Sequence, residues 1–555
     1  MARQPPEVRI CPNEGPKWSG NSRFPEVAPK GPQRTRLNRG CRPGIAASGL
    51  PAPAQRAARE AAVRLPDMSR RINSPSRHDV TLSNCRNNFV TSFAPGSELS
   101  RFRRADQRPV RGEPCGIATE TDSTFPGRET MQRRRFMNTL AAATAATSLM
   151  LKAGTAGAKS TAVPDALDPG RWSPFNAARL QAVLDQHGVA SARYDEKRRP
   201  YAVFDWDNTC IMNDCEEALL MYQINHLQYK LTPAEFVDVM WKDVPKGAFM
   251  KDYATVDGKP VTMEDLAADI ESDYRWLYAN YQGFGGDKSL DEIRETDQFK
   301  DFRAKLYFMY DAICDTHPLE IGYKWIIYFY KNMTTAELQA MAEASNNYGI
   351  GDALRKVRYE SPKTLPGKAG VVADTHFHGI RIHEEIRAVM HTLRANGIDV
   401  YVSTASLDDV VRVFAGNPNY GYGVPPANVI GLRLDMRDGK YTSTYPAGWH
   451  FNWGPGKTVG IRNVLESKKG YGPLLVFGDS DGDAWMLRDF KDTAAGVIVN
   501  RMKKGEIGAD SKLAAEQIGK SDARFLLQGR DEHTGLMIPD EKSIKYGKTE
   551  RKLLA

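Results

Sequence analysis

Two aspartates separated by a single residue, Asp205 and Asp207, directly follow a short apolar segment at residues 201–204. A third aspartate, Asp479, follows another apolar segment at 474–477. Carboxylate oxygens are the hard ligands that Mg²⁺ prefers, and a magnesium ion held this way can also share the phosphate oxygens of a substrate. The cation offsets the repulsion between an attacking carboxylate and an anionic phosphate. If the fold brings the three side chains together, this spacing indicates chemistry on phosphate esters.

Each of these groups has a role that such a reaction requires. A carboxylate nucleophile such as Asp205 divides phosphate-ester hydrolysis into two easier steps by forming an aspartyl phosphate, and a second carboxyl group can protonate the leaving alkoxide and later activate water. Lys457, at the expected start of a helix, could neutralise charge on Asp205 and on the phosphate. Thr404 offers a hydroxyl and a backbone N–H to a phosphoryl oxygen. Asp483 could bind a metal-bound water or orient Lys457.

The elements that must position these side chains are predicted strands that alternate with helices. Apolar runs rich in β-forming residues occur at 201–204, 398–402, 474–477 and 496–500, and an amphipathic helix is expected at 384–395. This alternation predicts βαβ units and an α/β fold with a parallel sheet. In such sheets the polar residues just beyond the carboxyl ends of the strands line the ligand crevice. A lone Asp-x-Asp or Gly-Asp-Ser is usually a turn, but the fixed order of these motifs at strand ends predicts one shared site.

The segment between the first two strands is too long for a simple crossover. Residues 215–381 are dominated by helical patterns and aromatic side chains, which predicts an inserted domain. The core would then consist of residues 171–214 plus 382–530, followed by a C-terminal tail at 531–555.

The positive net charge of the chain comes from its first part. Residues 1–130 contain 22 Lys and Arg against 12 Asp and Glu, whereas residues 159–555 contain 50 against 56. The mildly acidic body gives no reason to expect nucleic-acid binding. Residues 1–130 show no sustained period, so they are either a disordered leader or translated sequence upstream of a true start at Met131. We favour the second interpretation because of the segment that follows Met131.

Residues 131–158 have the pattern of a secretory signal peptide. Three arginines at 133–135 precede Phe136, an apolar run at 139–151 follows, and small residues at 156–158 provide a cleavage site. The paired arginines before phenylalanine are typical of twin-arginine signals. The apolar run is short for a membrane span. We therefore expect a periplasmic or secreted protein, a twin-arginine export machinery as its partner in transport, and no stable membrane anchor after cleavage.

The order of the motifs resembles the haloacid dehalogenase (HAD) superfamily. Its Asp-x-Asp-x-Thr motif is matched by residues 205–209, its Ser or Thr at a strand end by Thr404, with Ser403 as the alternative, its lone Lys by Lys457, and its Gly-Asp-x-x-x-Asp motif by 478–483. The resemblance implies a Rossmann-like parallel sheet with an inserted helical cap at 215–381. It also implies the following roles: Asp205 as nucleophile, Asp207 as general acid and base, Thr404, Ala405 and Lys457 around the phosphate, and Mg²⁺ bound by Asp205, the main-chain carbonyl of Asp207 and Asp479, with Asp483 nearby.

Several segments resemble, more narrowly, the bacterial phosphorylcholine phosphatases. They are Asp214-Cys-Glu-Glu-Ala-Leu-Leu220, Tyr323-Lys-Trp325, and the stretches at 397–402, 407–412 and 419–431. This resemblance implies that the substrate is a small phosphorylated alcohol, with phosphorylcholine as the first choice. Aromatic faces with a carboxylate nearby can hold a quaternary ammonium group. The residues implied for this role are Glu216, Glu217, Tyr323 and Trp325.

Three other interpretations remain open at this point. Within enzymes, the alternatives are a broad-specificity acid phosphatase and a phosphotransferase with an alcohol acceptor. From another class, the alternative is a catalytically silent protein that binds phosphorylated or choline-like solutes. The complete set of Asp205, Asp207, Lys457 and Asp479 argues against this last interpretation, because a pure binding protein needs no nucleophile.

Histidines at 376, 378 and 383 invite a zinc site, but we expect surface or cap-hinge histidines because no third ligand has suitable spacing.

Overall fold

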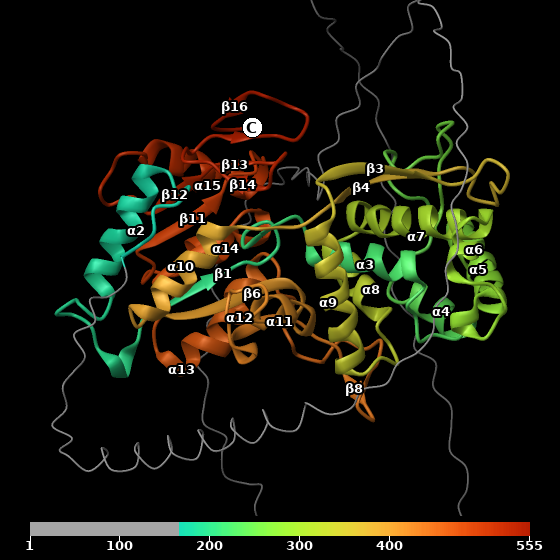
Figure 1. The fold of residues 1–555 in the computed structure, drawn as a ribbon, viewed down its shortest axis with the longest axis horizontal. Coiled ribbons are helices and arrows are strands. Elements are labelled where there is room, and N and C mark those ends of the chain that lie inside the picture. Colours follow the sequence, from blue (N-terminus) through green and yellow to red (C-terminus); the bar gives the residue numbers. More distant parts are fainter. Residues whose placement is uncertain (1–165) are drawn as a thin grey trace, which may run out of the picture. The chain divides into compact units, whose positions relative to one another are not determined.

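The computed structural model describes residues 166–555 (Figure 1). The leader predicted at 1–130 and the signal peptide predicted at 131–158 lie outside these residues, so both stay predictions. Within the described residues, no helix is both long enough and apolar enough to cross a bilayer.

The core is a six-stranded sheet in the order β12-β11-β10-β1-β6-β7. All neighbouring strands pair in parallel, which confirms the predicted α/β fold class. Alternate residues of β1 belong to two separate apolar clusters, because Ala202 and Phe204 pack in one and Tyr201 and Val203 in the other. Both faces of the sheet are therefore covered, as parallel sheets require. The strands are β1 (Tyr201–Phe204), β6 (Asp399–Leu407), β7 (Val429–Leu432), β10 (Leu475–Gly478), β11 (Ala495–Val499) and β12 (Phe525–Gln528).

The helices of the core connect or flank these strands. They are α2 (Pro174–His187), α10 (Glu384–Ala395), α11 (Asp408–Gly416), α12 (Pro455–Ile461), α13 (Ser467–Lys469), α14 (Ala484–Arg488) and α15 (Gly505–Gln517). A small hairpin, β8 (Met436–Arg437) with β9 (Lys440–Tyr441), follows β7.

The insert between β1 and β6 is mostly helical. Three of its helices begin with a capping box, in which a Ser or Thr bonds the third backbone N–H and a Glu at that position bonds back: Thr232 with Glu235, Ser289 with Glu292, and Thr334 with Glu337. The helices are α3 (Cys215–His226), α4 (Pro233–Met240), α5 (Met263–Asn280), α6 (Leu290–Arg294), α7 (Asp297–Thr316), α8 (Leu319–Tyr328) and α9 (Thr335–Gly351).

The insert also contains an antiparallel hairpin that the sequence patterns did not reveal. Strands β3 (Arg355–Glu360) and β4 (Ala373–His378) pair along their whole length and run over α7 (Figure 1). The chain leaves the core for the insert near β2 (Ile211–Met212) and returns near β5 (Arg381–Ile382), and we call these two segments the crossings. They are paired with each other, because β2 is antiparallel to β5.

The C-terminal residues form a sheet and not the predicted tail at 531–555. Strands β13 (Arg530–Asp531), β14 (Leu536–Met537), β15 (Ser543–Ile544) and β16 (Arg551–Lys552) make a four-stranded sheet. Strands of two residues are too short to show a period of two, so this sheet left no pattern in the sequence.

Candidate active site

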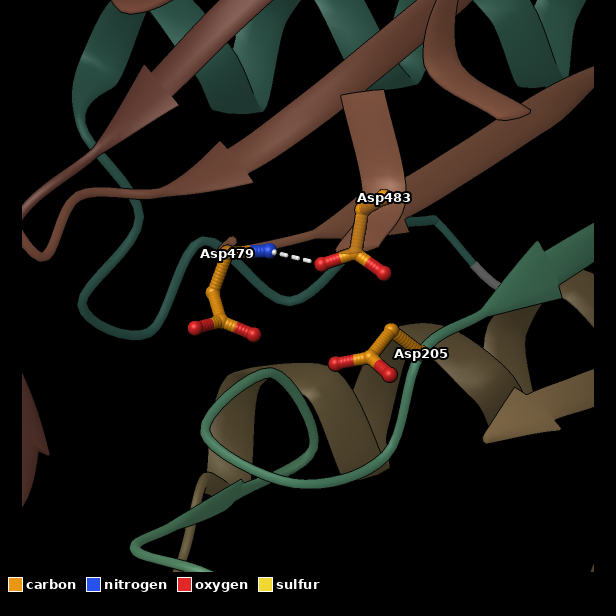
Figure 2. A group of neighbouring side chains, drawn as sticks. All are labelled: Asp205, Asp479 and Asp483. Atoms are coloured by element: carbon orange, nitrogen blue, oxygen red, sulfur yellow. Dashed lines mark hydrogen bonds between the residues drawn. The ribbon is translucent and has the colours of Figure 1, made fainter. Parts of the chain in front are cut away.

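Three carboxylates converge at the carboxyl edge of the parallel sheet. Asp205 follows β1 and Asp479 follows β10, and these strands are neighbours, with Phe204 opposite Phe477. One carboxylate oxygen each from Asp205, Asp479 and Asp483 lies within 4.8 Å of the others. Figure 2 shows the three carboxyl groups pointing toward a common space, with the Asp479 backbone N–H donating to Asp483 at 2.9 Å. The sheet therefore brings together aspartates that are far apart in the sequence.

Lys457 at the first turn of α12 lies against two of these carboxylates. Its Nζ is 2.5 Å from Oδ1 of Asp205 and 2.7 Å from Oδ1 of Asp483. Burial disfavours the ammonium and alone would lower the pKa of Lys457. The attractions of Asp205 and Asp483 together outweigh burial, so the pKa of Lys457 lies above its ordinary value. The lysine is therefore positively charged at neutral pH, next to the residue predicted as the nucleophile.

Burial, followed by the charge of Asp483, raises the pKa of Asp205 well above its ordinary value. The smaller part of this shift, which comes from the charges of Asp483 and Asp479, is repulsion of the kind that a bound cation relieves. At Asp479, burial also favours the neutral form, but the adjacent Arg501 and Lys503 lower its pKa. Arg501 donates to Oδ2 of Asp479 at 2.7 Å.

Thr209 connects the first and last motifs. Its hydroxyl lies 2.7 Å from Oδ2 of Asp205 and 3.0 Å from Oδ1 of Asp479. This contact explains the threonine of the Asp-x-Asp-x-Thr motif, because the hydroxyl fixes the separation of the two carboxylates that face the same space.

Asp207 occupies a different environment from this cluster. Its Oδ1 accepts from the Cys215 backbone N–H at 2.8 Å and its Oδ2 accepts from the Ser406 hydroxyl at 2.7 Å. Burial raises the pKa of Asp207, and these two hydrogen bonds oppose the shift. Its side chain is not one of the clustered carboxylates, so the structure does not place this side chain among the candidate metal ligands.

Asp483 belongs to the same carboxylate cluster and also contacts Lys457 and the backbone of its own motif. Its Oδ1 accepts from Lys457, and its Oδ2 accepts from the backbone N–H groups of Asp479 and Ser480 at 2.9 and 3.0 Å. Both oxygens are thus engaged. Of the two roles considered for Asp483 in the sequence, its geometry matches the orientation of Lys457.

The second motif contributes to the site through residues next to the one predicted. Ala405 and Ser406 line the active-site cleft, whereas the Thr404 side chain is fully buried and its hydroxyl accepts from the Ser406 backbone N–H at 3.1 Å. Ser403, the alternative, is likewise buried and contacts Asn452. Ser406, two residues after Thr404, was not among the residues predicted from the sequence.

The cluster lies in a cleft with a volume of about 1020 Å³ that extends into the insert. Glu216, Glu217 and Tyr323 line it, as the resemblance implied. Glu216 is buried, and its oxygens accept hydrogen bonds from the Tyr330 hydroxyl and, at 3.0 Å, from the Leu407 backbone N–H. Burial raises the pKa of Glu216 to about 7. This glutamate therefore joins the insert to β6 as well as lining the cleft.

Trp325 does not line the cleft, which corrects its assignment to substrate binding. Its indole N–H donates to the Met240 carbonyl at 2.8 Å, and its ring packs edge-on against Phe329 inside the insert. Residues two apart on a helix point about 200° apart. Because Tyr323 faces the cleft, Trp325 on the same helix must face the core.

The remaining lining of the cleft combines acidic side chains from the insert with aromatic and basic ones from both the insert and the core. Arg501 directly follows β11, so the rule that polar residues beyond strand ends line the crevice could have identified it. The acidic residues are Asp252, Asp311, Asp315, Glu320 and Asp374; the aromatic ones are Tyr253, Phe308, Tyr310, Phe451 and Trp453; the basic ones are Lys356, Arg358, Arg501 and Lys503.

A buried arginine from the C-terminal sheet holds Asn208, the residue between Asp207 and Thr209. Arg530 donates to the main-chain oxygen of Asn208 at 3.1 Å and to its side-chain oxygen at 3.2 Å. Asn208 lines the cleft and has a φ of 65°, a left-handed conformation that asparagine tolerates better than most residues. No sequence signal linked these two residues.

The three histidines considered for zinc are buried and not on the surface. His376 contacts the Tyr307 hydroxyl, His378 contacts the Tyr359 hydroxyl, and His383 contacts the Thr209 carbonyl. They lie in β4 and around the second crossing between insert and core.

Comparison with known proteins gives two informative matches. The chain is 26% identical over 368 residues to the phosphorylcholine phosphatase of Pseudomonas aeruginosa, a match that covers 60% of this chain and 81% of that protein. It is 31% identical to a conserved protein of unknown function from Anaerococcus prevotii, whose solved structure superposes with a TM-score of 0.65 over 68% of this chain and 98% of the other. No protein-family model matches the sequence.

Proposed function

We propose that the chain is a phosphatase of the haloacid dehalogenase superfamily: an exported, Mg²⁺-dependent phosphomonoesterase that acts through an aspartyl phosphate. Its leading substrate is phosphorylcholine. The observation that carries the proposal is the contact of Lys457 with Asp205 inside a cluster of three buried carboxylates.

Asp205 is the proposed nucleophile. One of its oxygens attacks phosphorus, the bond from phosphorus to the alcohol oxygen breaks, and the phosphoryl group is transferred to the carboxylate. Lys457 and the Thr209 hydroxyl hold the two oxygens of Asp205 before the attack. Water then attacks the aspartyl phosphate, releasing phosphate and restoring the carboxylate.

Asp207 is the proposed general acid and base. Burial raises its pKa, so this carboxyl group can carry a proton closer to neutral pH than a solvent-exposed aspartate can. It protonates the departing alkoxide and accepts a proton from the attacking water in the second step. The Ser406 hydroxyl and the Cys215 backbone N–H keep it apart from the cluster around Asp205.

The residues present fit a magnesium ion. Asp205 and Asp479 offer hard carboxylate oxygens in one buried space. After burial, the charges of Asp483 and Asp479 add to the rise in the pKa of Asp205, and a cation would offset this repulsion. These two side chains, with the main-chain carbonyl of Asp207, are the proposed ligands. A bound Mg²⁺ would supply charge neutralisation to the phosphate oxygens.

The cleft supports a cationic alcohol as the leaving group. Carboxylates and aromatic rings of the insert face the same space, and aromatic faces attract quaternary ammonium groups. The Pseudomonas aeruginosa relative is named for phosphorylcholine. Export rests on the sequence alone, through the arginines at 133–135, the apolar run at 139–151 and the small residues at 156–158.

A phosphate-release screen tests the proposal. The purified protein with Mg²⁺ is offered the phosphate monoesters of choline, ethanolamine, serine, glycerol, a sugar and a nucleoside. We expect the highest kcat/KM for phosphorylcholine and no release by Asp205→Asn, with Asp438→Asn, an exposed turn residue, as the matched control. Similar kcat/KM values on all esters would overturn the substrate but not the chemistry, whereas unchanged release by Asp205→Asn would overturn the chemistry.

A further inference from the structure

A second cavity, with a volume of about 290 Å³, lies next to the active-site cleft on the other side of a thin wall. Asn213, Asp214, His376 and Phe377 line both spaces and therefore form this wall. None of the residues proposed for the phosphoryl-transfer step, Asp205, Asp207 or Lys457, lines the second cavity. We call this space the hinge cavity.

Three arginines line the hinge cavity, and their ion pairs differ. Arg355 pairs with Asp352 at 3.0 Å, and Arg294 lies 3.3 Å from the exposed Asp291. Arg303 has no carboxylate partner among residues 166–555. Its guanidinium lies 4.7 Å from the centre of the Tyr359 ring and donates to the Asn225 side chain at 3.3 Å. The cavity therefore contains a positive charge that no acidic side chain balances.

Two polar atoms at the cavity are buried and have no hydrogen-bond partner. One is Nε of Arg303, and the other is the hydroxyl of Ser345, whose residue is 2% exposed. Buried donors of this kind are rare because each loses its hydration without compensation. The carboxylates that line the same cavity are already engaged: Asp214 accepts from the backbone N–H groups at the start of α3, and Asp352 accepts from Arg355.

From the unpaired Arg303 and the orphaned Ser345 hydroxyl in one cavity, we propose that the hinge cavity binds a small oxyanion of the phosphate class. An oxyanion supplies the acceptor oxygens that both donors lack, and arginine is the side chain best suited to tetrahedral oxyanions. The inference stands apart from the proposed function, because the Asp205 cluster lies in the other cavity.

The position of the site gives it a structural consequence. The cavity touches both crossings between core and insert, since Asn213 lies in the first and Gly379 in the second. The Asn213 side-chain amide already donates to the Gly379 carbonyl at 2.8 Å. A bound oxyanion adds contacts from α7 and α9 of the insert to the place where these two crossings meet, so its binding stabilises one orientation of the insert on the core.

Equilibrium dialysis with radiolabelled inorganic phosphate tests the site on the whole protein. Arg303→Gln removes the unpaired charge, Ser345→Ala removes the orphaned hydroxyl, and Arg275→Gln removes an exposed arginine of the same insert as a control. We expect the affinity of one phosphate-binding site to fall roughly tenfold or more in Arg303→Gln and by a smaller factor in Ser345→Ala. The affinity should not change in the control. Equal binding by all four proteins would overturn the site.

Thermal unfolding distinguishes a ligand role from a folding role. Without phosphate, Ser345→Ala should keep the Tm of the natural protein, because its hydroxyl makes no hydrogen bond; with phosphate, its rise in Tm should be smaller. A large drop in Tm without phosphate would contradict the proposal. If Arg303→Gln does not fold, Arg303→Lys retains the charge and should bind phosphate more weakly than the natural protein. Sulfate should compete with phosphate and acetate should not, since the site is proposed for tetrahedral oxyanions.

Discussion

The buried guanidinium of Arg530 donates two hydrogen bonds to Asn208, one to its main-chain oxygen and one to its side-chain oxygen. Asn208 lies between Asp207 and Thr209, so the arginine determines where the proposed acid and the hydroxyl that bridges Asp205 and Asp479 are held. Arg530 itself pairs with Glu532 at 3.4 Å. It is a positioning residue, because it acts on the reacting groups only through Asn208.

The first prediction concerns this contact. Arg530→Met should lower kcat by roughly tenfold or more while KM changes less, because a small displacement of the loop misplaces the reacting groups. It should also reduce the free energy of unfolding by about 3 kcal/mol, since the buried Glu532 loses one of its cations. Steady-state kinetics and chemical denaturation measure the two effects. Arg530→Met with Glu532→Gln should recover stability but not kcat; recovery of both would show that the residue has a structural role only.

The second prediction separates two aromatic residues of α8. Tyr323→Leu should raise KM for the choline ester several-fold with little change in Tm, because this ring faces the cleft. Trp325→Leu should lower the free energy of unfolding by about 2 to 4 kcal/mol, because it removes a fully buried ring. Parallel kinetics and thermal melts on both variants give the measurement. A KM effect at Trp325 that equals the one at Tyr323 would be inconsistent with their opposite orientations.

The third prediction concerns pH and Glu216. Its pKa is raised to about 7 in the folded protein by burial, whereas the unfolded chain has the ordinary value of 4.5. Between these two pH values the folded state binds more protons, so stability from this group is present at low pH and is lost as the pH rises toward 7. In the natural protein this group lowers the unfolding free energy by about 3 kcal/mol in total as the pH rises, and Glu216→Gln should remove that decline. Denaturation at pH 5 and pH 8 tests this, with the half-buried neighbour Glu217→Gln as control.

The fourth prediction concerns the metal. Removal of divalent ions by a chelator should abolish phosphate release, and Mg²⁺ should restore it. Asp479→Asn should raise the Mg²⁺ concentration needed for half-maximal activity by roughly tenfold or more, because it replaces an anionic ligand by a neutral one. Asp489→Asn, which alters a carboxylate bonded to Thr458 outside the cluster, is the matched control. Activity of Asp479→Asn that does not respond to Mg²⁺ would contradict the ligand assignment.

The fifth prediction concerns Lys457. Lys457→Met should lower kcat by roughly a thousandfold, because the Asp205 carboxylate and the phosphate would then lack their adjacent positive charge. Asp205 would also remain buried without its adjacent cation, so the unfolding free energy of the variant should rise as the pH falls and this carboxylate becomes protonated. Kinetics at pH 7 and denaturation at pH 5 and 8 measure both effects, and kcat equal to that of the natural protein would remove Lys457 from the mechanism.

The parallel sheet could be predicted from the sequence because its central strands are continuous apolar runs that end in polar motifs. The same reasoning placed Asp205 and Asp479 at one edge, since the carboxyl ends of parallel strands meet there. Sequence reasoning failed where the orientation of a side chain within its helix or strand decides whether that side chain lines the cleft. Tyr323 and Trp325 differ by two helical positions, and Thr404 and Ser406 by two strand positions along an irregular end of β6, where its register against β7 shifts. The resemblance implied both Tyr323 and Trp325, of which only Tyr323 lines the cleft, and it implied Thr404 but not Ser406, which lines the cleft.

The features that no pattern predicted depend on packing between elements that are distant in the sequence. Arg530 lies in a two-residue strand, and Ser345 and Arg303 lie on different helices of the insert. Their roles depend on which buried donors lack a partner, which follows from packing in three dimensions and leaves no periodic signal.

The contact between Arg530 and Asn208 joins residues 322 positions apart. On the ribosome, Asn208 therefore emerges long before the arginine that holds it, and the nascent chain carries its nucleophile in a loop that cannot yet be fixed. A message truncated just before codon 530 would yield all six strands of the parallel sheet but not the arginine that holds Asn208. The contacts that fix this loop are therefore completed only after the last strand of that sheet has been made.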